Sequence, residues 1–156
     1  MNIFVVDQDT MKCAEALDDL RLNKMIIETA QLLSTAMRVR GYTEDNIYKS
    51  THVNHPCAVW VRENISNYSW TLLYLSDLVE ERIRRTGKSH KTYEIYNALC
   101  AGPKIMPKGE LTPFVNCSTY KDLEVLEAYK KCLIDKWAAD IKPPKWTNSN
   151  KPKWAQ

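Results

Sequence analysis

The sequence predicts an all-α fold, a compact single-domain bundle of about five helices with a short extended N-terminal segment and an irregular basic C-terminal tail. Two observations support this prediction. Several long segments place apolar residues three and four positions apart, the spacing of a buried helix face. Glycine and proline interrupt the pattern where helices stop or start. At 156 residues the chain is expected to form one domain over residues 1–140, with residues 141–156 as its tail.

The first third of the chain is expected to hold two helices after the short apolar N-terminal run. Asp9 or Thr10 is expected to cap a first helix over residues 11–18. A longer helix over residues 19–40 is expected to stop at Gly41, because glycine adopts the left-handed conformation that ends many helices. Its predicted core face comprises Leu22, Met25, Ile26, Thr29, Leu32, Leu33, Ala36 and Met37.

Four further helices are expected over residues 56–63, 66–86, 91–100 and 121–139. The segments between them are polar or rich in glycine and proline, which is typical of loops. The side chains of the last helix that are expected to point inward are Leu123, Leu126, Tyr129, Leu133 and Trp137.

Composition favours a protein of a reducing compartment. The five cysteines are odd in number and scattered, unlike the disulfide framework of a small secreted protein. The N-terminus lacks the basic region of a signal peptide, and no apolar stretch approaches the roughly 20 residues of a membrane helix. We therefore expect a monomeric cytoplasmic protein (in the host cytoplasm if it is phage-encoded) with no membrane contact, cofactor or metal.

Positive charge is concentrated in the tail. The chain has 22 Lys and Arg residues against 19 Asp and Glu residues, a net charge of +3, and the tail has four lysines and no acid. Alternating basic and aromatic residues suit attraction to phosphate and stacking on bases. The alternative is a solvated tail whose tryptophans fold back on the core. The candidate DNA-binding residues of the tail are Lys145, Trp146, Lys153 and Trp154.

The helix expected over residues 19–40 carries a polar stripe beside its apolar face. Arg21, Lys24, Glu28 and Gln31 are separated by three, four and three positions, so they lie within roughly 80° around the helix. Two cations beside a carboxylate can hold a phosphate and keep the acid ionised. The ordinary alternative is an ion pair between Lys24 and Glu28 on a solvated face, which contributes about a few tenths of a kcal/mol.

Three short motifs lie in the first 90 residues. Residues 17–31 spell LDxxRLxKxxxExxQ, residues 55–60 spell HPxxxW, and residues 80–87 begin with two glutamates and end in Arg-Arg-Thr-Gly. Together they resemble the first long helix, the HPxxxW segment and the second long helix of the pyrimidine-dimer DNA glycosylase family, to which phage endonuclease V belongs. The basic aromatic tail is similar in character to the C-terminus of the phage enzyme.

The resemblance implies a compact helical enzyme that binds double-stranded DNA and cuts the glycosidic bond of a damaged or modified pyrimidine. In that family an amine attacks the sugar C1′ to form an imine, and a glutamate on the first long helix supports the reaction. Glu28 matches that glutamate, with Arg21 on the same helix face and Lys24 supplying charge near phosphate. A carboxylate suits this role because glycosidic cleavage builds positive charge on the sugar.

The N-terminus departs from the family pattern. The phage members use the freed α-amine of a small second residue, whereas the second residue here is Asn2, before which methionine removal is normally poor. The nucleophile would then be the α-amine of Met1 or the side chain of Lys24. Alternatively, Glu28 activates a water molecule, as in a monofunctional glycosylase. These residues do not decide whether the protein has an abasic-site lyase step or which lesion it recognises.

Two further groups carry suitable chemistry. His52, His55 and Cys57 have the residue types of a metal site. A single local cluster that lacks a fourth ligand is weak evidence for such a site. His55 is instead expected to start the helix at Pro56 and to contact the substrate. After the glycine that ends the preceding helix, the candidate phosphate-binding residues are Lys88, His90 and Lys91.

Two other classes of protein fit the same residues. One is a non-catalytic protein of the same fold that binds nucleic acid or a nucleotide. The other is a small inhibitor or adaptor that binds a protein through its tryptophan-rich tail. A carboxylate on a basic stripe favours the enzyme over the binding protein, because binding phosphate does not need Glu28.

Overall fold

The computed structural model describes residues 1–156, which form α-helices and short 3₁₀ helices and no strand. The all-α prediction is confirmed. The α-helices are α1 (Thr10–Ala16), α2 (Asp19–Val39), α3 (Pro56–Val61), α4 (Ile65–Thr86), α5 (Tyr96–Leu99) and α6 (Val125–Ala139). The 3₁₀ helices are η1 (Lys91–Ile95), η2 (Gly102–Ile105) and η3 (Lys153–Ala155).

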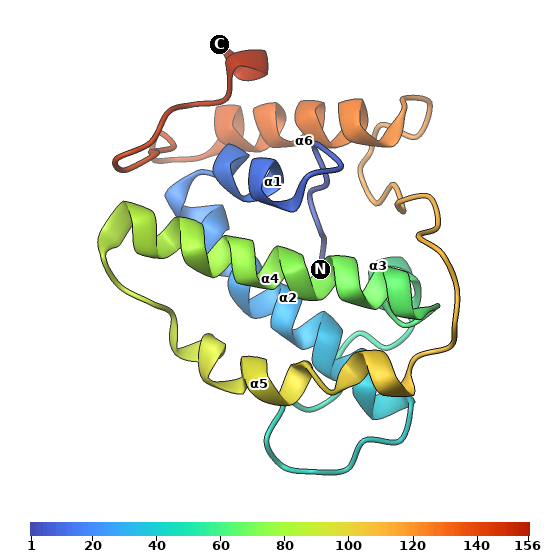
Figure 1. Cartoon of the computed structure of the whole chain (residues 1–156). Coiled ribbons are helices and arrows are strands. Elements are labelled where there is room, and N and C mark those ends of the chain that lie inside the picture. Colours follow the sequence, from blue (N-terminus) through green and yellow to red (C-terminus); the bar gives the residue numbers. More distant parts are fainter.

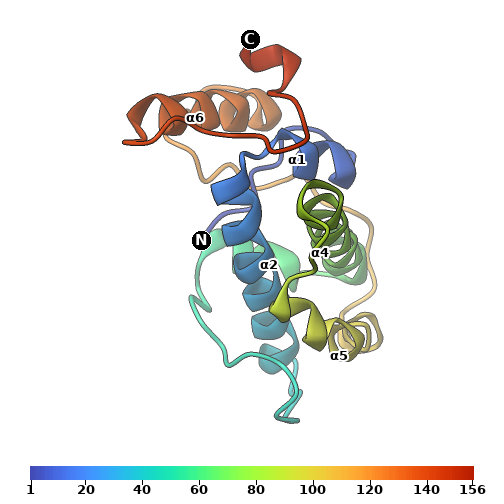
Figure 2. The same ribbon diagram turned by 90° about the vertical axis from the view of Figure 1, so that its left-hand side faces the viewer.

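Helices α2 and α4 pack against each other at the centre of the molecule, and α1 packs on α4 (Figure 1). Helix α6 covers the end of the bundle near α1, while η1, α5 and η2 cover the opposite end (Figure 1). Figure 2 shows α2 running from one end to the other, with the N-terminal segment beside it. The first residues of the chain therefore lie next to the helix that carries the predicted polar stripe.

The predicted helix boundaries are confirmed to within a few residues, and side chains account for most of them. The carboxylate of Asp9 accepts hydrogen bonds from the first turn of α1, as expected for a cap. Gly41 and Gly87 both have left-handed φ angles, of 93° and 72°, after the ends of α2 and α4. The segment expected to form one helix over residues 91–100 instead forms the 3₁₀ helix η1 followed by the short helix α5. Helix α6 begins four residues late because Glu124 caps it through the amides of Leu126 and Glu127.

The core face predicted for α2 is confirmed, since all eight of its residues are buried. The face predicted for α6 is confirmed at Tyr129, Leu133 and Trp137, whereas Leu123 lies before the helix and is exposed. One region of the interior is polar: Glu81 and Arg85 near the end of α4 are both buried. The HPxxxW segment begins α3, and its tryptophan, Trp60, is buried in the core.

No helix has the length and apolar character needed to cross a membrane.

Candidate active site

Glu28 lies in the third turn of α2, at the edge of the core. Its side chain is 15% exposed, while that of Lys24 one turn earlier is 67% exposed, and the two form an ion pair with 3.6 Å between Nζ and Oε1. The ordinary i,i+4 pair considered from the sequence is therefore present. The two partners differ in environment, however, because only the carboxylate is largely shielded from solvent. Gln31 follows on the same side of α2 and is half-buried.

Arg21, the first residue of the stripe, has carboxylate partners within the fold. Its Nη1 and Nη2 atoms bond both oxygens of Asp140 at 2.7 and 2.9 Å, and Nη1 also contacts Asp18 at 3.2 Å. The hydrogen bonds from Arg21 lower the pKa of the Asp140 carboxyl. This bidentate pair joins the start of α2 to the end of α6. Arg21 therefore has a structural role, and binding of a phosphate by its guanidinium would compete with Asp140.

The N-terminal segment is held in a defined turn beside the core. The side-chain oxygen of Asn2 accepts hydrogen bonds from the amides of Ile3 and Phe4 at 2.7 and 3.1 Å. Phe4 adopts a left-handed φ of 53°, and its ring packs edge-on against Tyr129 of α6. Met1 is half-buried and packs against the hydrophobic core. Asn2, which departs from the family pattern, thus organises the turn that fixes the position of Met1.

The N-terminal ammonium and the carboxylate of Glu28 both influence His55 at the start of α3. His55 caps α3 by accepting the amide hydrogen of Cys57 at Nδ1, 3.1 Å away, so the prediction that it starts this helix is confirmed. Burial lowers the pKa of His55, the N-terminal ammonium lowers it further, and Glu28 opposes both effects. The same ammonium and the same carboxylate act on Cys57. The α-amine of Met1 and the carboxylate of Glu28 therefore each lie within electrostatic range of His55, which defines one neighbourhood of the molecule.

Cys117 joins this neighbourhood from the loop before α6. Its Sγ lies 3.5 Å from the Sγ of Cys57, and both thiols are reduced. The sequence does not point to this residue, because 60 positions separate the two cysteines and no motif surrounds the second one. Only the folding of the loop onto α3 and α6 brings them together.

The candidate phosphate-binding residues Lys88, His90 and Lys91 lie just before and at the start of η1, which is a separate element from α2 and α3. His90 accepts the amide hydrogen of Thr92 at Nδ1, 3.1 Å away, and so caps η1. Burial and the nearby Arg82 lower its pKa. Lys88 and Lys91 on either side of it are exposed. These two lysines are open to an anion, whereas one nitrogen of His90 is occupied by the backbone.

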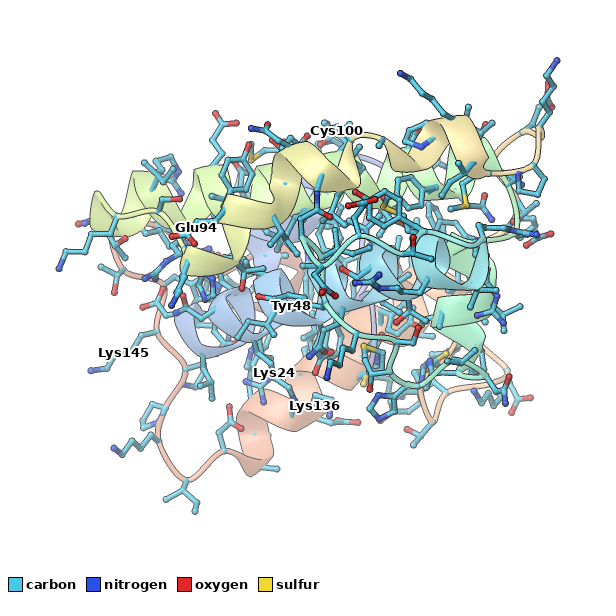
Figure 3. All side chains as sticks on the ribbon, turned by 90° about the horizontal axis from the view of Figure 1, so that it is seen from below. Lys24, Tyr48, Glu94, Cys100, Lys136 and Lys145 are labelled. Atoms are coloured by element: carbon cyan, nitrogen blue, oxygen red, sulfur yellow. The ribbon has the colours of Figure 1, made fainter.

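The tryptophans of the tail contact the folded domain, whereas its lysines are exposed. Trp146 donates its indole hydrogen to the carbonyl of Ala16, and Trp154 stacks on Trp137 of α6 at a centroid distance of 5.8 Å. The tail is also not wholly irregular, because η3 forms one short turn around Trp154. Lys145 and Lys153 are exposed, and Figure 3 shows Lys145 extending away from the helices. The alternative in which the tryptophans fold back on the core is therefore the arrangement observed.

A family model described as pyrimidine dimer DNA glycosylase matches residues 1–95. The matched part runs from the N-terminal turn to η1 and includes Met1, Glu28 and His55, while Cys117 and the tail lie outside it. No curated protein and no solved structure matches the chain.

Proposed function

The chain belongs to the pyrimidine dimer DNA glycosylase family, and on that premise we propose that it cleaves the glycosidic bond of a damaged or modified pyrimidine in double-stranded DNA. One observation carries this proposal. The N-terminal segment runs beside α2 (Figure 2), the helix that carries the largely shielded Glu28, and both the N-terminal ammonium and this carboxylate are near enough to His55 to influence its pKa. An amine beside a carboxylate is the pair of groups that imine-forming glycosidic cleavage requires.

In the proposed reaction the neutral α-amine of Met1 attacks C1′ of the nucleotide, and the glycosidic bond breaks with its electron pair leaving on the base. Glu28 stabilises the positive charge that develops on the sugar, because a fixed carboxylate in a partly desolvated site interacts strongly with it. The departing base takes up one amine proton, and the second passes to O4′ as the sugar ring opens, which gives an imine between Met1 and C1′. Transfer of a 2′ proton to Glu28 would then allow strand cleavage at the abasic site.

Exposed lysines supply a surface for the DNA backbone. Lys24 of α2 and Lys136 of α6 lie near each other in the view of Figure 3, and Lys145 of the tail extends outward at the left edge of that view. Lys24 is four residues from Glu28, so a phosphate held there would lie close to the carboxylate. A base inside a duplex must also leave the stack before its C1′ is reached, and phosphate contacts hold the strand while this happens.

The experiment that tests this proposal is borohydride trapping. The protein is incubated with duplexes that carry a pyrimidine dimer, uracil, a modified pyrimidine or an abasic site, with and without borohydride. We expect base release on one damaged substrate and a covalent protein–DNA complex that peptide mapping assigns to Met1. Intact mass measured beforehand identifies the N-terminal residue, and selective acetylation of the α-amine should abolish trapping.

The same experiment separates the other mechanisms and classes. A complex mapped to Lys24 would move the nucleophile to that side chain. Base release without any trapped complex would favour water activated by Glu28. DNA binding without base release on any of the four substrates would contradict the enzyme and favour the non-catalytic binding protein.

A further inference from the structure

We propose that His55, Cys57 and Cys117 form a binding site for a borderline-soft divalent transition-metal ion, for which Zn²⁺ is the best fit. This inference does not depend on whether the protein cuts DNA. It concerns three side chains from two distant segments of the chain, the start of α3 and the loop before α6.

The geometry of the three donors suits a single ion. One ligand atom from each residue lies within 4.8 Å of the other two, and the two sulfurs are 3.5 Å apart. Two thiolates on a tetrahedral Zn²⁺ are about 3.8 Å apart, given a Zn–S bond of about 2.3 Å. The sulfurs are already close to this separation, so binding requires a small movement of the imidazole and not a refolding of the site.

The donor set selects the class of metal. Two sulfurs and one imidazole nitrogen favour Zn²⁺ and related ions, whereas Mg²⁺ and Ca²⁺ prefer oxygen ligands. Three protein ligands also leave a fourth tetrahedral position open, as in zinc sites that keep a water molecule. Binding would convert the Cys57 thiol to a thiolate and release its proton to solvent.

The surrounding fold holds the donors in place. The amide hydrogen of Cys117 is donated to the Tyr129 hydroxyl at 2.9 Å, and that hydroxyl donates to the carbonyl of Val115 at 2.7 Å. This pair of bonds fixes the loop to α6. His55 is fixed as the cap of α3. Since Nδ1 accepts the amide hydrogen of Cys57, it carries the available lone pair of the neutral ring and is the nitrogen that would bind the ion.

Metal binding at Nδ1 would displace the hydrogen bond by which His55 caps α3. When Nδ1 binds the metal, the amide of Cys57 loses its acceptor, and the metal-bound sulfur of Cys117, which lies beside the Cys57 side chain, would be available to accept its hydrogen instead. Amide hydrogen bonds to a metal-bound thiolate are typical of the groups that support metal ligands.

A disulfide between the two cysteines is the competing explanation for their proximity. The sulfur separation of 3.5 Å is far longer than a disulfide bond of about 2.05 Å. The two explanations differ in an observable way, because a metal site requires reduced thiols.

The test uses Co²⁺ as a spectroscopic replacement for Zn²⁺ in the full-length protein, kept reduced by a phosphine. We expect one Co²⁺ per chain, with the visible bands of tetrahedral Co²⁺ and a near-ultraviolet thiolate-to-cobalt band that Zn²⁺ displaces. Cys117→Ser should lower the thiolate band to about half and weaken Zn²⁺ binding by about tenfold or more. Cys132→Ser is the matched control, because that thiol is also half-buried but lies on α6 outside the cluster.

His55→Gln provides a second variant that keeps both thiols. It should weaken binding of the ion without reducing the number of thiolates that contact it. Circular dichroism should show the helix content of the wild type. The proposal is overturned if the fully reduced wild type gives no tetrahedral cobalt spectrum. It is also overturned if Cys117→Ser keeps the full thiolate band and the wild-type affinity, or if Cys132→Ser loses the spectrum, since the ion would then be bound elsewhere.

Discussion

Glu81 and Arg85, one turn apart in α4, form an ion pair in which both side chains are only 1% exposed, with 2.7 Å between Oε1 and Nε. Arg84 adds a second pair to the same carboxylate. Arg85 continues to the Asp19 carboxylate at 3.0 Å and to the carbonyl of Glu15 at 3.1 Å. The network thus ties the end of α4 to the junction of α1 and α2, from which α2 carries Glu28 into the site.

Removal of one partner of this network should destabilise the protein strongly. Arg85→Met leaves Glu81 buried with Arg84 as its remaining cation, and breaking a buried pair typically costs about 3–5 kcal/mol. The free energy of unfolding, measured by urea denaturation, should fall by that order. Glu80→Gln is the matched control, because Glu80 is the neighbouring but exposed carboxylate, and it should change stability by less than about 0.5 kcal/mol. Equal effects of the two variants would contradict a special role for the buried pair.

Stability should also fall in acid because of this network. Burial raises the pKa of Glu81, but the hydrogen bonds from Arg84 and Arg85 outweigh it and place the pKa below its ordinary value of 4.5. Burial also raises the pKa of Asp19, and hydrogen bonds from Thr147 and Arg85 again outweigh it, so that this pKa is lowered too. A lowered folded-state pKa contributes stability that is present above the unfolded value and is lost as the pH falls through the folded value.

Urea denaturation between about pH 7 and pH 3 measures this dependence. We expect the free energy of unfolding to decline as the pH drops below about 4.5, in the window between the unfolded and the lowered folded pKa values. Glu81→Gln should flatten the decline, since glutamine does not titrate. A variant that keeps the full wild-type slope would show that other carboxylates cause the loss of stability.

The sequence was sufficient for the parts of the fold that depend on local periodicity and capping. The apolar stripe of α2, the cap at Asp9 and the glycines after α2 and α4 are local signals, and each is found where it was predicted. The start of α6 was placed too early, because lysine and aspartate at residues 121–122 fit a helix as well as a loop. The helix begins only where Glu124 satisfies its first amides.

Long-range contacts were the part that the sequence did not reveal. The buried position of Arg85 could not be seen in a segment with two glutamates and three arginines, which is typical of a solvated helix end. The partner of Arg21 lies 119 residues away at Asp140, and that of Cys57 lies 60 residues away at Cys117. Polar side chains of this kind acquire their roles only when distant segments fold together, so their chemistry cannot be assigned from spacing alone.

The lysines and the tryptophans of the tail should have separable effects. Replacement of Lys142, Lys145, Lys151 and Lys153 by glutamine should leave the melting temperature unchanged, because all four are exposed. It should weaken DNA binding and reduce the slope of log affinity against log salt by up to about 3.6, or about 0.9 for each phosphate that is no longer neutralised. Fluorescence anisotropy at several salt concentrations measures both quantities. Lys104→Gln with Lys108→Gln, two exposed lysines in and just after η2 and away from the tail, is the control that should leave the slope unchanged.

Trp154→Ala should show the reverse pattern. Its half-buried ring stacks on Trp137 at an interplanar angle of 21°, so truncation removes this aromatic packing and should lower the melting temperature. The salt slope should stay that of the wild type, because the variant keeps every cation of the tail. A melting temperature equal to that of the wild type, together with weaker DNA binding, would favour Trp154 as a base-stacking residue instead.

Glu28→Gln is the sharpest test of the proposed chemistry. Glutamine keeps the size and hydrogen-bonding capacity of the side chain but removes the charge that would stabilise a cationic sugar. Turnover on the damaged duplex should fall by about 10²–10³, the range seen when one preorganised electrostatic interaction with a transition state is removed. DNA affinity should hold or rise slightly, because a negative charge leaves a surface that already carries Lys24. Single-turnover kinetics and anisotropy measure the two effects separately.

The structure also predicts that Glu28→Gln leaves the fold intact. The ion pair with Lys24 is 3.6 Å long and its cation is largely solvated, so its removal should cost only about a few tenths of a kcal/mol. Glu80→Gln again serves as the control and should retain full turnover. Wild-type turnover in Glu28→Gln would remove this carboxylate from the mechanism. A large loss of stability would instead mean that Glu28 supports the core edge between α2 and α3, and the catalytic assignment would have to move to another group near Met1.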